Sequence, residues 1–141
     1  MRLEIHKVAQ DYLPRKKLHS LFERVVARES GRGRKGTVSL VFTTDEEIQV
    51  LNREFRSIDR PTDVLSFNLD EPDSDESVFG EIYIATPTAR RQASSYRGTV
   101  TNEFLRLFCH GLLHLFGYDH MNERDAGRMK EREEHYLATP Q

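Results

Sequence analysis

The chain contains 141 residues, of which 37% are hydrophobic and 31% are charged, and its formal net charge is −2. This composition is typical of a globular domain with a moderate core, so we expect residues 1–141 to form a single domain. No apolar run approaches the ~18 residues of a membrane span, and the N-terminal stretch lacks the apolar segment of a secretory signal. These features predict a cytoplasmic protein without a membrane partner. The single cysteine, Cys109, excludes an internal disulfide.

The charges are unevenly placed along the chain. Residues 31–36 form a basic loop, whereas 70–77 holds five acidic residues among its eight. Arg53, Arg56 and Arg60 precede the acidic loop. The global basic excess that is common in polyanion-binding proteins is absent, so any anion site must be local. We expect both charged loops to be solvated surface.

The first elements alternate between strand and helix. Residues 3–5 read as a short strand, and the apolar positions of 18–26 recur at helical spacing behind Pro14, a residue suited to a helix start. The β-branched, apolar run at 37–42 predicts a second strand.

A capping-box pattern marks the next helix. Thr44 is followed three residues later by Glu47, which predicts a helix that runs through Phe55. The stretch 63–68, behind the breaker Pro61, predicts a third strand.

The second half predicts one more strand and three helices. Residues 80–86 alternate between apolar and polar positions, and Pro87 then suits the first turn of a helix running to about Tyr96. An apolar helix is predicted at 102–116 and a charged one at 122–137. Together the elements predict an α+β (mixed α/β) fold, a single layered domain in which about five helices pack on a four-stranded mixed sheet.

Three histidines fall within eleven residues in the stretch HGLLHLFGYDH at 110–120. His110 and His114 are four residues apart, so on a helix they project from one face and can share a metal ion. Gly117 follows where helices commonly end in a left-handed residue, so the chain can turn and bring His120 back. Three neutral imidazoles form a zinc site of the catalytic type, with a fourth position open.

The alternative is that these histidines are ordinary core residues of the apolar helix at 102–116. Burying three imidazoles without a shared partner would cost a few kcal/mol each, by the rough scale for unpaired polar groups. We therefore predict one Zn²⁺ per chain, held by His110, His114 and His120 at about 2.0–2.1 Å. Cys109 points about 100° away around the helix and is expected to be a small buried hydrophobe.

The spacing H-x-x-x-H-x-x-G-x-x-H is that of the metzincin proteases, which carry a glutamate general base directly after the first histidine. Here that position is Gly111, so peptide hydrolysis by the usual route is not expected. Because glycine weakens a helix by about 1 kcal/mol relative to alanine, we expect the helix itself to tolerate Gly111→Glu, with fit against the sheet as the main risk.

A phosphodiester is a suitable target for this site. Zinc lowers the pKa of bound water to about 7, and guanidinium groups stabilise the charge that develops on phosphoryl oxygens. Spacing alone does not choose the guanidinium, and the candidates are Arg56, Arg60, Arg90, Arg91 and Arg106.

The histidine stretch resembles the signature H-G-x-L-H-L-x-G-Y-D-H of the YbeY family of bacterial endoribonucleases and ribosomal RNA maturation factors, and it matches at every fixed position. LNREFRSIDRPTDVLSF at 51–67 resembles the family's other hallmark, which reads approximately L-N-x-x-[FY]-R-x-x-[DN]-x-P-T-D-V-L-S-F. GEIYIA at 80–85 resembles the next strand of the family. The resemblance covers most of residues 48–121.

The resemblance implies a zincin-related fold, zinc bound by the three motif histidines, and a role for Arg56 in catalysis and in binding RNA phosphate. It implies a metal-dependent endoribonuclease that cleaves single-stranded RNA, acting in small-subunit ribosomal RNA maturation and ribosome quality control. The implied partners are ribosomal RNA and the ribosome or its small subunit, and no DNA is expected. The acidic loop at 70–77 would repel RNA if it lined the groove.

Two other functions remain open. One is a peptidase-like metallohydrolase, and Gly111 argues against it because it cannot act as the general base. A non-catalytic ribosome-assembly factor with a structural zinc is the other, and a structural zinc normally has four protein ligands. Asp119 and Cys109 are the nearby candidates for a fourth ligand.

Overall fold

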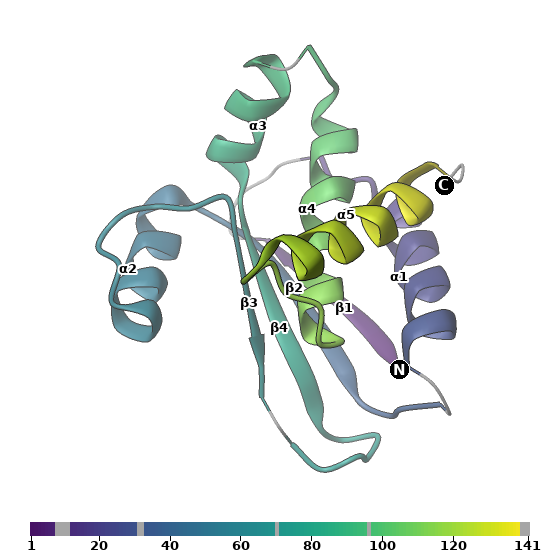
Figure 1. Ribbon diagram of the computed structural model, residues 1–141. Helices are drawn as coiled ribbons and strands as arrows, with labels where there is room; N and C mark the ends of the chain where they lie inside the picture. Colours follow the sequence, from purple (N-terminus) through teal and green to yellow (C-terminus); the bar gives the residue numbers. More distant parts are fainter. Residues whose placement is uncertain (8–11, 31–32, 70, 96, 139–141) are drawn as a thin grey trace.

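The computed structural model describes residues 1–7, 12–30, 33–69, 71–95 and 97–138. The strands are, in chain order, β1 (Arg2–Lys7), β2 (Thr37–Thr43), β3 (Val64–Asn68) and β4 (Val78–Ala85). They form a mixed four-stranded sheet in the order β1-β2-β4-β3 (Figure 1). β1, β2 and β4 are parallel, whereas β3 pairs antiparallel with β4 and is an edge of the sheet.

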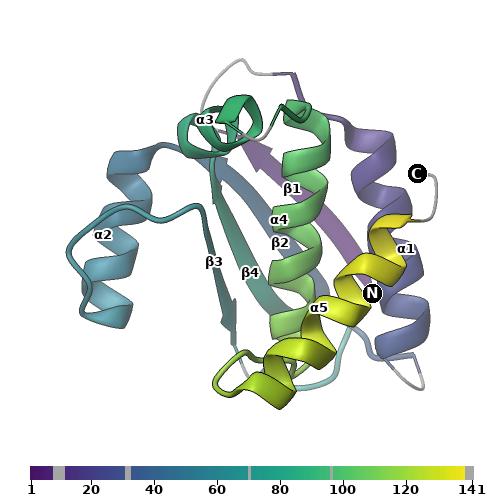
Figure 2. The same cartoon turned by 45° about the horizontal axis from the view of Figure 1, so that its top comes forward.

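Helices cover both faces of this sheet. They are α1 (Arg15–Glu29), α2 (Asp45–Arg56), α3 (Thr86–Ser95), α4 (Val100–Leu115) and α5 (Glu123–Ala138). α4 crosses one face beside α1, and α5 packs against both, while α2 lies beside β3 and α3 follows the end of β4 (Figure 2). None of the helices in the described ranges combines the length and apolar character that crossing a membrane requires.

The alternation along β4 decides which helix each side chain contacts. Ile82 and Ile84 are fully buried in the main core with α4, while Tyr83 points to the opposite face. There Tyr83 packs with Leu65 and Phe67 of β3 in a smaller core against α2. Because successive side chains of a strand point to opposite faces, the period-2 pattern predicted at 80–86 corresponds to a strand covered on both sides.

The predicted α+β class, with four strands and five helices, is confirmed. β1 is longer than the predicted strand at 3–5, because its backbone pairs with β2 over all six residues although its ends are polar. α4 begins before the predicted residue 102, because the Thr99 hydroxyl caps it by accepting a hydrogen bond from Asn102 N at 3.0 Å. Tyr96, the predicted end of the preceding helix, lies outside the described residues.

The capping box predicted at Thr44 is half formed. The Thr44 hydroxyl accepts a hydrogen bond from Glu47 N at 3.1 Å and caps α2. The Glu47 carboxylate, however, accepts from the hydroxyl of Thr43 on β2. This contact ties the start of α2 to the end of the preceding strand.

The two charged loops contact each other, and most of their described charged residues are exposed, as expected for solvated surface. The Arg34 guanidinium donates to the Glu71 carbonyl at 3.0 Å, and Lys35 N donates to the Asp73 carboxylate at 2.7 Å. The Glu71 carboxylate in turn accepts from Val78 N at 2.9 Å, at the start of β4. Residues 31–32 and 70 of the two predicted loops lie outside the described ranges.

Candidate metal centre

His110 and His114 lie on the last two turns of α4. Their Nε2 atoms are 3.1 Å apart. A tetrahedral zinc ion with bonds of about 2.0–2.1 Å would hold two ligand nitrogens about 3.3 Å apart. Two ring nitrogens that face each other at 3.1 Å can therefore share such an ion with little adjustment.

The chain turns sharply directly after the second histidine. Tyr118 N–H donates to the Leu113 carbonyl at 3.0 Å and Gly117 N–H donates to the His114 carbonyl at 3.1 Å, which is a Schellman motif. Gly117 has a φ of +98°, a backbone conformation that favours glycine. The left-handed turn predicted from the glycine is confirmed.

This turn brings His120 to the other two rings. Its ring centroid lies 5.7 Å from that of His110 and 5.1 Å from that of His114. The three residues offer ligand atoms that all lie within 4.8 Å of one another. Imidazole donors in this arrangement suit Zn²⁺ and several other divalent transition metals.

The local electrostatics favour the neutral imidazole that binds a metal. The pKa of His114 is lowered from its ordinary value, first because burial disfavours the charged ring. The charges of His110, His120 and Arg56 lower it further. Neutral His114 has a free ring nitrogen for a metal ion.

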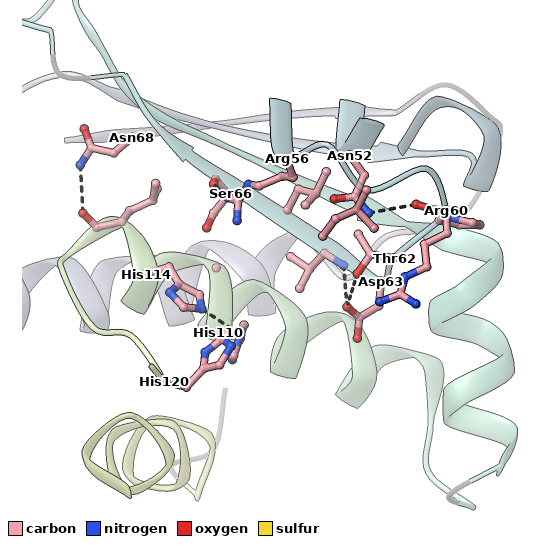
Figure 3. A pocket seen from close by; sticks show the side chains of 16 residues that line it. Asn52, Arg56, Arg60, Thr62, Asp63, Ser66, Asn68, His110, His114 and His120 are labelled. Atoms are coloured by element: carbon pink, nitrogen blue, oxygen red, sulfur yellow. Dashed lines mark hydrogen bonds between the residues drawn. The ribbon is translucent and has the colours of Figure 1, made fainter. Parts of the chain in front are cut away.

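The histidines open onto a groove of about 510 Å³ between α4 and the edge strand β3. Figure 3 shows the three rings on one side of this groove and Arg56, Arg60 and Ser66 on the other. Residues 60–66 form most of the wall opposite α4. None of the described acidic-loop residues, 71–77, lines the groove, so they do not repel a ligand from within it.

Arg56, the last residue of α2, reaches across the edge of the sheet. Its Nη2 donates to the Ser66 carbonyl on β3 at 2.9 Å, and its guanidinium lies 5.5 Å from the ring centroid of Phe67. Arg56 is exposed. One hydrogen bond therefore orients the guanidinium in the groove while leaving most of its donors free for an anion.

Asn52 is a groove-lining residue that the sequence did not single out. It is 4% exposed, and its Nδ2 donates to the Arg60 carbonyl at 2.9 Å. This bond holds the loop that carries Arg60 against α2, so a second guanidinium lines the groove. A buried asparagine in the otherwise apolar face of a helix is a signal that could have indicated this role.

The other candidate arginines lie outside the groove lining. Arg91 pairs with the Asp45 carboxylate at 2.8 Å. Arg106 forms two hydrogen bonds with the Glu103 carboxylate, at 2.9 and 2.7 Å, and they are the main reason that its pKa is raised. Arg90 is exposed on α3. The structure thus places two of the five candidates, Arg56 and Arg60, in the groove that the histidines also line.

Neither candidate for a fourth ligand joins the three histidines in the described part of the chain. Cys109 is fully buried in the main core, and burial is the main cause that raises the pKa of its thiol to about 12. The Asp119 carboxylate accepts from Met121 N at 3.2 Å. Cys109 is therefore the buried hydrophobe that was predicted, and the cluster has three candidate ligands among these residues.

Glu133 of α5 contacts the centre from another helix. Its Oε1 lies 2.5 Å from Nδ1 of His110, the ring nitrogen on the opposite side from the one that faces His114. The sequence analysis did not find this residue, because it is one of many charged residues in the last helix. Its spacing of 23 positions from His110 matches no local pattern.

The risk expected for Gly111→Glu, its fit against the sheet, is present in the structure. A Cβ atom at this position would lie 2.8 Å from Cγ2 of Ile82 on β4, and Ile82 is fully buried. The glycine therefore lets α4 approach the sheet closely. Gly111→Glu would disturb this packing, so a change in the activity of that variant could not be assigned to the added carboxylate.

We expect Gly111→Ala to lower the free energy of unfolding by more than about 1 kcal/mol, since the strain against Ile82 exceeds the gain in helix propensity. Gly127→Ala in α5 is the matched control, because no atom apart from its chain neighbours and the backbone of its own helix lies within 4 Å of the Cβ position there. The control is expected to be neutral or to stabilise by up to about 1 kcal/mol. Urea denaturation measures both variants, and equal stabilisation by both would contradict the close approach.

The chain is similar to known proteins over most of its length. The family model described as "Endoribonuclease YbeY" matches residues 4–141. A relative of that name from Moorella thermoacetica is 39% identical over 150 aligned positions, which cover 98% of this chain and 96% of the relative. The relative of that name from Shouchella clausii is 43% identical over 122 positions, covering 79% of this chain and 76% of the relative.

A solved structure is also similar. The solution structure of TM1509 from Thermotoga maritima has 33% sequence identity and a TM-score of 0.66, and the match covers 96% of this chain and 86% of that chain. A fold shared over nearly the whole length and a family match from residue 4 to residue 141 show that this chain belongs to the endoribonuclease YbeY family.

Proposed function

We propose that residues 1–141 act as one metal-dependent endoribonuclease domain that cleaves single-stranded RNA in small-subunit ribosomal RNA maturation and ribosome quality control. The observation that carries the proposal is the convergence of three imidazoles with two guanidinium groups, Arg56 and Arg60, in one groove. In this proposal His110, His114 and His120 hold one Zn²⁺ per chain. When bound, the zinc ion supplies a Lewis acid at the scissile phosphodiester.

The charges of the groove suit a phosphodiester. Arg56 keeps free guanidinium donors, and such forks match two oxygens of a phosphate. Asp63 is the acidic side chain among the described residues that line the groove. Its carboxylate accepts hydrogen bonds from Val64 N at 2.8 Å and from Gln92 Nε2 at 3.3 Å, which reduces its repulsion of an anion. In the proposed reaction, the free donors of Arg56 bind and orient the phosphate.

Two observations weigh against peptide hydrolysis. Gly111, which is among the residues that line the groove, has no side chain to act as a general base. An extended peptide would bind most readily by pairing with the edge strand β3. On that strand the Ser66 carbonyl already accepts a hydrogen bond from Arg56, and Val64 N already donates one to the Asp63 carboxylate. These two backbone groups are therefore not free to pair with a peptide.

The assembly-factor alternative predicts a closed zinc site. The histidine cluster has three protein ligands in the described ranges and opens onto the groove, which favours a site that admits a substrate.

The test is cleavage of a circular single-stranded RNA by zinc-loaded protein, with the same sequence annealed into a duplex as the control. A circle has no ends, so linear products require endonucleolytic cleavage. We expect cleavage of the circle, slower cleavage of the duplex, and loss of activity after metal is removed by a chelator. An intact circle at high protein concentration, with one zinc bound per chain, would refute the enzymatic proposal and favour the assembly factor.

End-group analysis of the same products identifies the nucleophile. A 2′,3′-cyclic phosphate indicates attack by the ribose hydroxyl, whereas a 5′-phosphate indicates attack by water.

The proposed partners are ribosomal RNA and the ribosome or its small subunit, and the proposed location is the cytoplasm. Co-sedimentation of the protein with purified small subunits, against large subunits as the control, tests the association. Equal recovery with both subunits would contradict it.

A further inference from the structure

Glu133 meets His110 on the side of the ring that faces away from the histidine cluster. The Glu133 carboxylate oxygen lies 2.5 Å from His110 Nδ1, and His110 Nε2 faces His114 Nε2 at 3.1 Å. The side chain of Glu133 is 17% exposed and that of His110 is 28% exposed. An ionised carboxylate can only accept a hydrogen bond, so the proton of this contact belongs to Nδ1. The neutral His110 ring then keeps its lone pair on Nε2, directed at the cluster.

The position of Glu133 on α5 is set by packing. Met129 and Tyr136, four residues before it and three residues after it, are each 2% exposed and belong to the main core. Residues at this spacing share one face of a helix, so Glu133 lies between two buried anchors on the face of α5 that packs against α4. The Tyr136 hydroxyl also donates to the Glu29 carboxylate of α1 at 2.5 Å. The carboxylate is thus presented to His110 by a helix that is anchored in the main core.

We propose that Glu133 is a positioning residue of the metal centre, which fixes the orientation and the tautomer of His110 so that Nε2 is available to the metal ion. This inference rests on the proposed metal site. Carboxylates that accept from the second ring nitrogen of a metal-binding histidine raise ligand basicity and hold the ring in place. The C-terminal helix α5 becomes part of the metal centre in consequence, although it contributes no ligand to it.

The test compares Glu133→Gln with Glu134→Gln in the full chain. Both changes remove one negative charge from the same turn of α5, but Glu134 is exposed and does not line the groove. Zinc affinity is measured by competition with a chelator. We expect Glu133→Gln to weaken zinc binding about 10–100-fold, the range found for such outer contacts, and Glu134→Gln to leave it unchanged.

A second readout separates positioning from a merely structural role. A glutamine amide can donate to Nδ1 as well as accept from it, so the tautomer of His110 is no longer enforced. Nitrogen-15 NMR of the metal-free protein should show the Nδ1–H tautomer of His110 in the wild type and in Glu134→Gln, and a mixture of tautomers in Glu133→Gln. The melting temperatures of the three metal-free proteins are expected to agree closely.

Unchanged zinc affinity in Glu133→Gln would overturn the inference. So would a fall in affinity that comes with a lowered metal-free melting temperature and an unaltered tautomer, since that combination describes a packing contact. These readouts need no RNA. Failure to cleave RNA would therefore count against the proposed activity alone, while normal cleavage and normal zinc affinity in Glu133→Gln would count against the positioning role alone.

Discussion

His114→Ala is expected to lose the bound metal and RNA cleavage together. His114 is the middle ligand of the cluster, with its Nε2 at 3.1 Å from that of His110 and its ring centroid at 5.1 Å from that of His120. Removing it leaves two imidazoles from different segments of the chain, too few for a stable zinc site. Since loss of an outer contact alone typically costs 10–100-fold in metal affinity, loss of a ligand should exceed about 100-fold in both affinity and cleavage rate.

The measurement is metal content and cleavage rate in the same preparations of wild type, His114→Ala and His19→Ala. His19 is exposed on α1 and outside the groove, so His19→Ala controls for the loss of a histidine as such. We expect one zinc per chain in the wild type and in the control. A His114→Ala protein that cuts RNA at the wild-type rate would show that the cluster is not the catalytic centre.

Arg56→Ala is expected to depress RNA cleavage by about 100-fold or more, since it removes a charge-stabilising group beside the phosphate. Its effect on folding should be small. The side chain is exposed, and its contacts are one hydrogen bond to the Ser66 carbonyl and a guanidinium 5.5 Å from the ring centroid of Phe67. We expect the free energy of unfolding to fall by roughly 0.5–1 kcal/mol. The protein should keep its metal, which distinguishes this variant from His114→Ala.

Arg53→Ala is the matched control on the same helix. Arg53 is exposed, pairs with Asp59 at 3.7 Å and does not line the groove, so its loss removes the same charge outside the site. Arg56→Lys keeps the charge but loses the planar fork, and we expect an intermediate rate. The salt dependence of RNA binding should become shallower by about 0.7 per lost phosphate contact in Arg56→Ala. Equal effects of Arg53→Ala and Arg56→Ala on cleavage would contradict a specific role for Arg56.

Local patterns in the sequence determined much of the candidate site. The spacing of His110 and His114 is the repeat of a helix, and the left-handed turn depends on one glycine, Gly117, with a φ of +98°. The cap at Thr44 and the alternation along β4 are likewise encoded within a few residues. Such features could be predicted because the backbone conformation that produces them is decided by neighbours in the chain.

The tertiary structure decided everything that depends on contacts between distant segments. The strand order β1-β2-β4-β3 makes β3 an edge strand, and only that placement brings the Ser66 carbonyl to Arg56. The same packing selects Arg56 and Arg60 from five candidate arginines. Sequence spacing carried no information on this choice, because each arginine is placed by the element that it follows rather than by its distance from the histidines.

Gly111 and Glu133 show the same division between local and distant information. In the sequence, Gly111 stands where a protease would carry its general base. In the structure, a Cβ atom at position 111 would lie 2.8 Å from Ile82, so the close packing of α4 on the sheet favours a residue without a side chain. Glu133 carries no local signal, and it reaches His110 because Met129 and Tyr136 bury one face of α5. Helix periodicity sets which residues share a face, whereas the close packing of whole elements sets which faces meet, and only the folded chain contains the second kind of information.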